Sequence, residues 1–167
     1  YFNDDVTPCL ELDHYFVQCG YSQISTSGHN SLEDGTTNGR GGLGTVYVFA
    51  AGNEYDRGED VNYEGYLNSR FTMSVGAVYS DLTHSLYSSS GAPVFISAPG
   101  GDGGNMAVAQ PVGNGVTDNC ADAGEGTSFA APLISGVAAR VLEANPQLTR
   151  RDARGATAAT ARTELSD

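Results

Sequence analysis

The chain has 167 residues, 40% of them hydrophobic and 9% aromatic, which suits one globular domain with a hydrophobic core. Its formal net charge is −12. That charge argues against nucleic acid as a partner, because a phosphate backbone needs a basic face. No apolar stretch reaches the length of a transmembrane helix, and the first residues show no signal peptide.

The acidic residues suggest a cationic partner, such as a basic peptide or calcium. The simpler interpretation is a solvated acidic surface with no binding role, and the composition alone favours it. The three cysteines, Cys9, Cys19 and Cys120, show no zinc-ligand spacing, and their pairing cannot be deduced from an odd count.

Three short apolar runs predict buried strands. Residues 1–40 come first and are polar and weakly periodic, with one short helix expected at 30–35. The runs at 45–50, 71–78 and 93–98 follow, rich in β-branched and aromatic residues and separated by Gly-rich or polar loops. They are typical of parallel strands covered on both faces.

Two helices are expected after the strands. The first begins at Ser128 and is stopped by Asn145-Pro146. The second follows the capping-box pattern that opens at Thr149 and runs to about Ala161. Strands followed by an Ala-rich helix indicate a layered α/β architecture. The apolar positions at helical spacing in the first helix are Phe129, Leu133, Val137, Val141 and Leu142.

The strongest chemical signal is Gly-Thr-Ser-Phe-Ala-Ala-Pro at 126–132. It places the hydroxyl of Ser128 where a loop turns into a helix, whose first N–H groups stabilise negative charge beside a nucleophile. The alternative is that Thr127 or Ser128 only caps the helix. The heptapeptide alone does not decide between the two.

A second signal is Asn53, which follows the first predicted strand in Val-Phe-Ala-Ala-Gly-Asn, residues 48–53. Open α/β sheets place ligand-binding groups at the carboxyl ends of their strands. An amide at that position can donate a hydrogen bond to an oxyanion. An Asn in an ordinary turn after a strand is the simpler interpretation of this motif taken alone.

Together and in this order, the two motifs resemble the subtilisin superfamily of serine proteases, and most of all its kexin/furin branch. The similarity covers roughly residues 30–155. Further segments shared with that branch are Gly-Arg-Gly-Gly-Leu-Gly at 39–44, Asn-Tyr-Glu-Gly-Tyr-Leu-Asn-Ser at 62–69, Ser-Val-Gly-Ala-Val at 74–78, and the segment 142–152.

The resemblance implies a partial subtilisin-like three-layer α/β fold, with a mostly parallel sheet and a buried helix that starts at the nucleophile, Ser128. Asn53 is implied as the oxyanion donor. We expect residues 1–29 to be an unmatched segment or insertion, 30–160 the C-terminal half of the catalytic domain, and 161–167 a tail.

The family also uses an Asp and a His, in the order Asp, His, Ser. None of His14, His29 and His84 lies in the His-Gly-Thr context of the family. We therefore expect both residues on an upstream half of the same domain, and we expect this chain alone to be inactive, because a Ser without a general base is a weak nucleophile.

The resemblance assigns Glu64 to the pocket that recognises a basic residue before the cleaved bond. It marks Glu59 and Asp60 as candidate calcium ligands. Ser89 stands where the family has a Glu that completes the calcium site. One carboxylate fewer weakens a site for a hard cation.

The function expected is that of a serine endopeptidase of the proprotein-processing type, acting on peptides or proteins in the secretory pathway or outside the cell. The alternative is a non-catalytic binding module with the same fold. Retention of both Ser128 and Asn53 argues against that alternative. A third reading, an unrelated acidic calcium-binding module, is disfavoured because the sequence contains no repeat.

Overall fold

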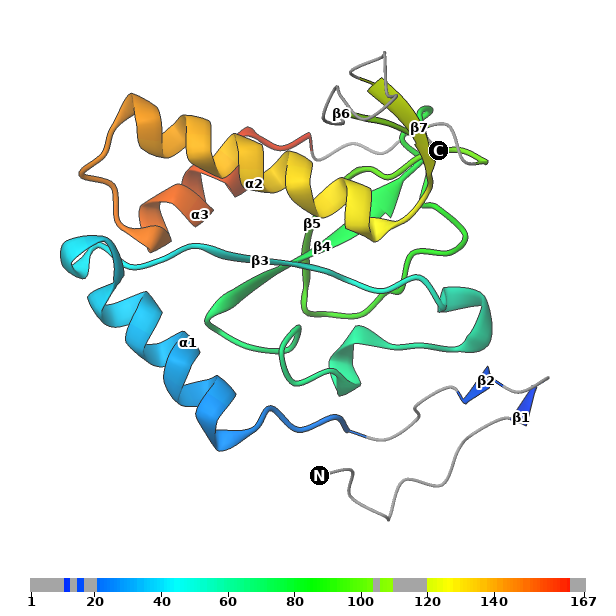
Figure 1. The fold of residues 1–167 in the computed structure, drawn as a ribbon, viewed down its shortest axis with the longest axis horizontal. Helices are drawn as coiled ribbons and strands as arrows, with labels where there is room; N and C mark the ends of the chain where they lie inside the picture. Colours follow the sequence, from blue (N-terminus) through cyan, green and yellow to red (C-terminus); the bar gives the residue numbers. More distant parts are fainter. Residues whose placement is uncertain (1–10, 13–14, 17–20, 104–105, 110–119, 163–167) are drawn as a thin grey trace, which may run out of the picture.

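The computed structural model describes residues 11–12, 15–16, 21–103, 106–109 and 120–162, and is shown as a ribbon in Figure 1. Cys9, Cys19 and His14 lie outside the described residues. The helices are α1 Thr26–Asn38, α2 Thr127–Ala144 and α3 Arg150–Thr160, with short 3-10 turns at Gly39–Gly42, Tyr55–Arg57 and Val61–Tyr63. The strands are β1 Glu11–Leu12, β2 Tyr15–Phe16, β3 Tyr47–Ala50, β4 Thr72–Val78, β5 Val94–Pro99, β6 Met106–Ala109 and β7 Cys120–Gly124.

The three predicted apolar runs form one parallel sheet in the order β3-β4-β5. β4 is the central strand, and each of its seven residues is buried. The register pairs Val48 with Met73 and Val75 with Ile96. The prediction of parallel strands is confirmed, with boundaries that differ by one or two residues. Burial holds fully for β4 alone, because β3 is half-buried and β5 is mostly half-buried or exposed.

Helix α2 packs across this sheet, and α3 folds back beside it (Figure 1). Most core side chains are small, which lets the helix backbone approach the strands closely. The core consists of Met73, Val75 and Ala77 of β4, Ala98 of β5, and Ala130 and Ile134 of α2.

The side of α2 that meets the sheet differs from the large apolar positions named from the sequence. Ala130, Ile134 and Ala138 are buried, whereas Leu133 and Val137 are 44% and 43% exposed. The helix therefore carries a second apolar stripe that no described residue covers fully. Spacing alone could not show this, because both stripes recur with helical periodicity.

Helix α1 begins four residues before the helix expected at 30–35 and ends three residues after it. Ser25 is its N-cap, and the Ser25 hydroxyl accepts a hydrogen bond from the Gly28 N–H at 3.1 Å. Only Leu32 and Thr36 of the helix are buried. This explains the weak apolar periodicity of its sequence.

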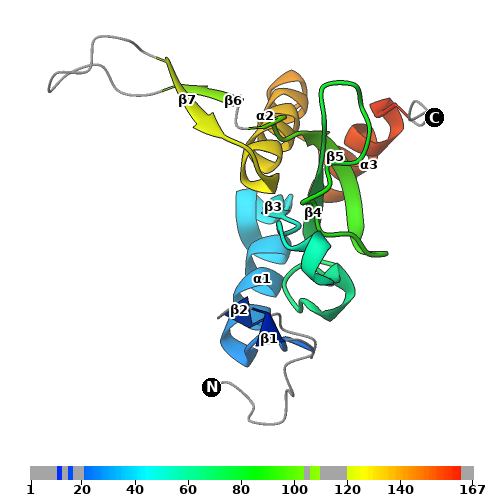
Figure 2. The ribbon, with the colours of Figure 1, turned by 90° about the vertical axis from the view of Figure 1, so that its right-hand side faces the viewer.

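The second predicted helix is confirmed with its cap. The Thr149 hydroxyl accepts from the Asp152 N–H at 3.2 Å, and the Asp152 carboxylate accepts from the Thr149 N–H at 2.9 Å. The antiparallel β6–β7 hairpin was not expected, and it projects from the rest of the molecule (Figure 2). Within the described part of the chain, no helix is both long and apolar enough to cross a membrane.

Candidate active site

The two sequence signals meet at the carboxyl edge of the sheet. β3 ends at Ala50, and the chain turns at Gly52 to present Asn53. The turn before α2 reaches the same edge, because the Gly126 N–H donates to the Gly100 carbonyl at 2.8 Å and the Gly100 N–H donates to the Val78 carbonyl at 3.1 Å. This is the edge at which open α/β sheets bind ligands.

The turn at Gly52 requires glycine for two reasons. Its φ of 110° lies in the left-handed region that side chains disfavour. A Cβ there would also lie 2.3 Å from a carboxylate oxygen of Glu59 and 2.9 Å from the Ser89 hydroxyl. Glycine therefore lets the loop that carries Asn53 pack against those two side chains.

Thr127 joins this loop to α2. Its side chain is fully buried, and its hydroxyl accepts from the Gly52 N–H at 3.2 Å while donating to Oδ1 of Asn53 at 3.0 Å. The backbone N–H of Thr127 donates to the same Oδ1 at 2.8 Å. The first residue of α2 therefore holds Asn53 by two hydrogen bonds.

These bonds fix the orientation of the Asn53 amide. A backbone N–H can only donate, so the atom facing Thr127 must be the amide oxygen, and the NH₂ group lies on the other branch of the side chain. Within the described part of the chain, Nδ2 of Asn53 has no hydrogen-bond partner. Asn53 is exposed, so this donor is available to a ligand.

Ser128 is the second residue of α2 and is exposed. The N-cap of the helix is Gly126, with φ 151° and no side-chain capping bond. The Thr127 hydroxyl forms hydrogen bonds with residues 52 and 53 instead of capping the helix. The interpretation of Thr127 or Ser128 as simple helix caps is therefore wrong, and the Ser128 N–H remains one of the unpaired donors of the first turn.

Neither described histidine serves Ser128. His29 lies on α1 and packs edge-on against Phe71, with ring centroids 5.3 Å apart. His84 packs edge-on against Tyr55 at 5.2 Å. Among the described residues, no hydrogen bond joins a histidine to Ser128, so the arrangement provides a hydroxyl and oxyanion donors but no general base.

Glu64 is partly buried beside the segment that precedes α1. The Gly65 N–H donates to the Ser22 carbonyl at 2.8 Å, and residues 22 and 64 form a parallel bridge. Burial raises the pKa of Glu64 above its ordinary value of 4.5, and the nearby charge of Glu59 raises it further, while a hydrogen bond from Ser22 opposes both. A cationic ligand beside Glu64 would offset the free-energy cost of ionising a partly buried carboxylate.

The candidate calcium ligands are occupied by protein donors. A carboxylate oxygen of Glu59 accepts from the Ser89 hydroxyl and from the Glu54 N–H, the latter at 3.3 Å. Asp60 accepts from the backbone N–H and the side-chain amide of Asn62, at 2.9 and 2.7 Å.

Calcium usually takes six to eight oxygen ligands, often from several carboxylates. Among the described residues, no three His, Cys, Asp or Glu side chains are grouped to hold a metal ion. The described residues therefore supply fewer carboxylates around Glu59 and Asp60 than a calcium site usually has, and the assignment of these two as ligands stays a prediction.

Sequence reasoning missed two residues that organise this site, Thr127 and Ser89. Thr127 stood inside the quoted heptapeptide but was considered only as a cap. Ser89 was noted only as the place of a lost carboxylate, yet it is buried and its hydroxyl also lies 3.3 Å from the Glu54 N–H, from which it accepts. Thr127 had an available signal, a small hydroxyl residue between Gly126 and an apolar helix, whereas Ser89 is one of three consecutive serines at 88–90 and had none.

Comparison with known proteins gives one consistent result. The Subtilase family matches residues 19–167. Kexin from Saccharomyces cerevisiae is 39% identical over 129 residues, covering 73% of this chain and 14% of its own length. Human proprotein convertase subtilisin/kexin type 4 is 39% identical over 118 residues, covering 71% of this chain and 15% of its own length.

Solved structures agree with this result. A cold-adapted subtilisin-like serine proteinase has a TM-score of 0.65 at 25% identity, covering 87% of this chain and 48% of its own. Proteases from Pseudoalteromonas arctica have a TM-score of 0.70 at 24% identity and show the same fold, covering 88% of this chain and 43% of theirs. The chain thus spans about half of these structures and a much smaller part of the curated relatives.

Proposed function

This chain belongs to the subtilase family, and we propose that it supplies the nucleophile and the oxyanion donors of a serine endopeptidase. The observation that carries the proposal is the hydrogen-bonded pair of Asn53 and Thr127. These hydrogen bonds hold the Asn53 side chain against the first turn of α2, which also carries exposed Ser128. A non-catalytic protein has no chemical need for that arrangement.

In the proposed reaction, the Ser128 hydroxyl oxygen attacks the carbonyl carbon of a peptide bond while a general base removes its proton. The carbonyl oxygen becomes an oxyanion, which accepts hydrogen bonds from Nδ2 of Asn53 and from the Ser128 N–H. Collapse of the intermediate breaks the C–N bond, and the protonated base gives its proton to the leaving amine. Water then releases the acyl group from Ser128.

The general base and its orienting carboxylate are proposed to come from another part of the same domain, upstream of the described residues. Two features support the proposal that an upstream part of the domain packs against the described residues. Among the described strands, β3 and β5 each pair only with β4, so the outer edge of β3 is open to a further strand from the upstream part. The stripe of Leu133 and Val137 on α2 is exposed and apolar, as a surface covered by further chain would be.

We further propose that the substrate is a peptide or protein with a basic residue before the cleaved bond. Glu64 is partly buried and already disfavoured as a lone carboxylate by burial and by Glu59. An Arg side chain pairs with such a carboxylate through two parallel hydrogen bonds, which makes the preference specific. Proprotein processing of this kind supports the further proposal that the protein acts in the secretory pathway or outside the cell.

The competing function is a binding module that keeps the fold without catalysis. A fluorophosphonate probe separates the two, because it reacts only with an activated serine. In the full-length protein, the probe should label Ser128, and Ser128→Ala should abolish both labelling and cleavage of a basic fluorogenic peptide. The isolated 167-residue chain should show neither. A full-length protein that is not labelled supports the binding module.

Specificity needs a separate experiment. In the full-length enzyme, kcat/KM should favour Arg over Leu before the cleaved bond, and Glu64→Gln should reduce that ratio. Glu143→Gln is the matched control, because Glu143 is exposed and pairs with Arg140 on α2. An Arg preference that survives Glu64→Gln undiminished removes Glu64 from the recognition pocket without affecting the assignment of Ser128.

A further inference from the structure

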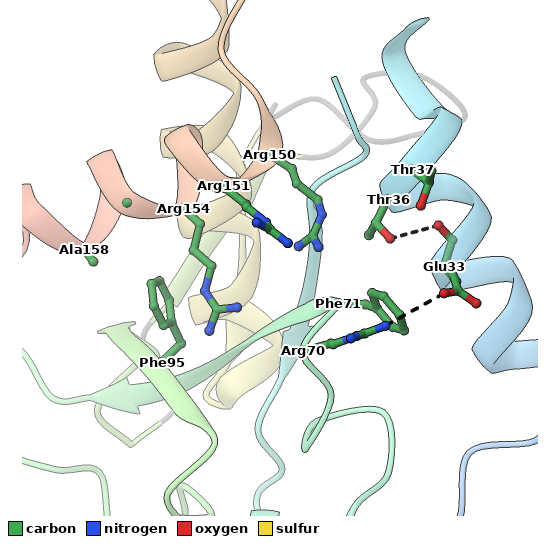
Figure 3. Close-up of a pocket in the computed structure, with 11 residues that line it drawn as sticks. Glu33, Thr36, Thr37, Arg70, Phe71, Phe95, Arg150, Arg151, Arg154 and Ala158 are labelled. Carbon is green, nitrogen blue, oxygen red and sulfur yellow. Dashed lines mark hydrogen bonds and ion pairs between the residues drawn. The ribbon is translucent and has the colours of Figure 1, made fainter. Parts of the chain in front are cut away.

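A cavity of about 480 Å³ lies between α1 and α3, against the starts of β4 and β5 (Figure 3). Arg70 and Phe71 precede β4, and Phe95 is near the start of β5, so this cavity lies at the amino ends of the parallel strands. Asn53 lies at their carboxyl ends. The cavity is therefore separate from the candidate active site.

Half of the chain's arginines line this cavity. Of eight Arg side chains in a chain with no Lys and a net charge of −12, four line this one space. They come from parts of the sequence that are 80 residues apart and converge only in the fold, as Figure 3 shows. The four are Arg70, Arg150, Arg151 and Arg154.

Two of these guanidinium groups are held in place by aromatic rings. The Arg154 guanidinium carbon lies 4.3 Å from the centre of the Phe95 ring. That of Arg70 lies 4.8 Å from the centre of the Phe71 ring. Stacking on a ring face restricts the side chain but leaves its N–H donors free at the edge. The donors are thus preorganised around the cavity.

One carboxylate faces four positive charges at this cavity. Glu33 is the carboxylate at this cavity, and one of its oxygens lies 3.8 Å from Arg70. Within the described residues, Arg150, Arg151 and Arg154 form no ion pair. Burial lowers the pKa of Arg150, and the charges of Arg151, Arg154 and Arg70 lower it further. The four guanidinium groups repel one another, so an anion bound among them is electrostatically favourable.

We propose that this cavity binds a small multivalent oxyanion, a compound that carries phosphate groups or several carboxylates. Guanidinium groups bind both kinds of oxyanion through paired N–H donors. The volume is in the range of small-molecule sites and exceeds that of a single monovalent ion. The hydroxyl-bearing residues Thr36 and Thr37 of α1 line the opposite wall.

The test uses the full-length protein and three probes, which are inorganic phosphate, pyrophosphate and citrate. Calorimetry and thermal unfolding are measured against sodium chloride of equal ionic strength. We expect saturable binding and a raised Tm with at least one multivalent probe. Pyrophosphate and citrate distinguish a phosphate ligand from a polycarboxylate, and preference for either one supports the proposal.

Variants locate the binding. Arg151→Gln should weaken binding about tenfold, because it removes charge-assisted hydrogen bonds from an exposed side chain that the core does not need. Arg140→Gln, on the exposed side of α2, should leave affinity unchanged. The proposal is overturned if no probe binds saturably, if chloride gives the same shift, or if both variants weaken binding equally.

Discussion

Oδ1 of Asn53 accepts hydrogen bonds from both the backbone N–H and the hydroxyl of Thr127, at 2.8 and 3.0 Å. These residues are 74 positions apart in the sequence and join the end of β3 to the start of α2. The contact orients the amide donor of Asn53 and fixes the position of the 52–53 loop relative to the first turn of α2, which carries Ser128. Thr127 is thus a positioning residue for the proposed oxyanion site.

Replacing the Thr127 hydroxyl should affect stability and catalysis together. Thr127→Val keeps the shape of this fully buried side chain but leaves the Gly52 N–H without its acceptor. We expect a loss of about 1–3 kcal/mol in the free energy of unfolding, which is typical for an unsatisfied buried polar group. Urea unfolding of the full-length protein measures it.

Thr127→Ser is the matched control, because it keeps the hydroxyl and removes only a methyl group. It should retain most of the kcat that Thr127→Val loses. If the two variants lose kcat equally, the hydroxyl does not position Asn53.

Asn53→Asp separates positioning from catalysis at the same residue. The aspartate keeps an oxygen for the two Thr127 donors but has no N–H for the oxyanion. We expect kcat to fall by about 10²–10³-fold, the loss known for the equivalent amide in subtilisin, with KM little changed. Thermal unfolding should show a folded protein. A variant with normal kcat would remove Asn53 from the oxyanion site.

The sequence predicted those parts of the fold whose signals are local. The three strands have short apolar runs, and α3 has a capping box, so both were predicted close to their true boundaries. Helix α1 was predicted only in part, because it contains Gly28 and Gly35 and buries only two residues. Its position depends on contacts such as the Thr45 N–H donating to the Gly35 carbonyl at 2.8 Å, which no local pattern encodes.

The site was predicted through motifs, and its supporting contacts were not. Asn53 and the first turn of α2 meet as expected, whereas the roles of Thr127 and Ser89 follow from contacts across 74 and 30 or more positions. The arginine cavity could not be predicted at all. Arg70 lies between Ser69 and Phe71, and Arg154 lies between Ala153 and Gly155, so neither position carries a local signal. Only the fold brings the two side chains to one cavity.

The Ser89 hydroxyl should stabilise the loop that carries Asn53 without any metal. It donates to the Glu59 carboxylate, accepts from the Glu54 N–H, and is almost fully buried. Ser89→Ala leaves both partners short of a hydrogen bond, so we expect a loss of about 1–3 kcal/mol in stability. The loss should be equal in calcium and in chelator, as measured by urea unfolding. A loss confined to calcium buffer would show that a calcium ion acts through these residues.

The last prediction concerns the ionisation of Glu64. Its pKa is raised above 4.5 in the fold by burial and then by Glu59. The folded state therefore favours the protonated form relative to the unfolded chain. This contribution to stability is fully present below pH 4.5 and is lost as pH rises through the folded pKa. At pH 7 an ionised Glu64 lowers the stability of the protein.

Glu64→Gln removes that penalty, because the amide is neutral at every pH and its oxygen can still accept from Ser22. The variant should be more stable than the parent at pH 7, and the difference should shrink towards zero below pH 4.5, as followed by urea unfolding at both pH values. Glu143→Gln, at an exposed ion pair, should show no such gain. A Glu64→Gln variant that is less stable at pH 7, or whose gain persists unchanged at pH 4, contradicts the prediction. A gain at pH 7 combined with loss of the Arg preference would show that Glu64 is retained for recognition at the expense of stability.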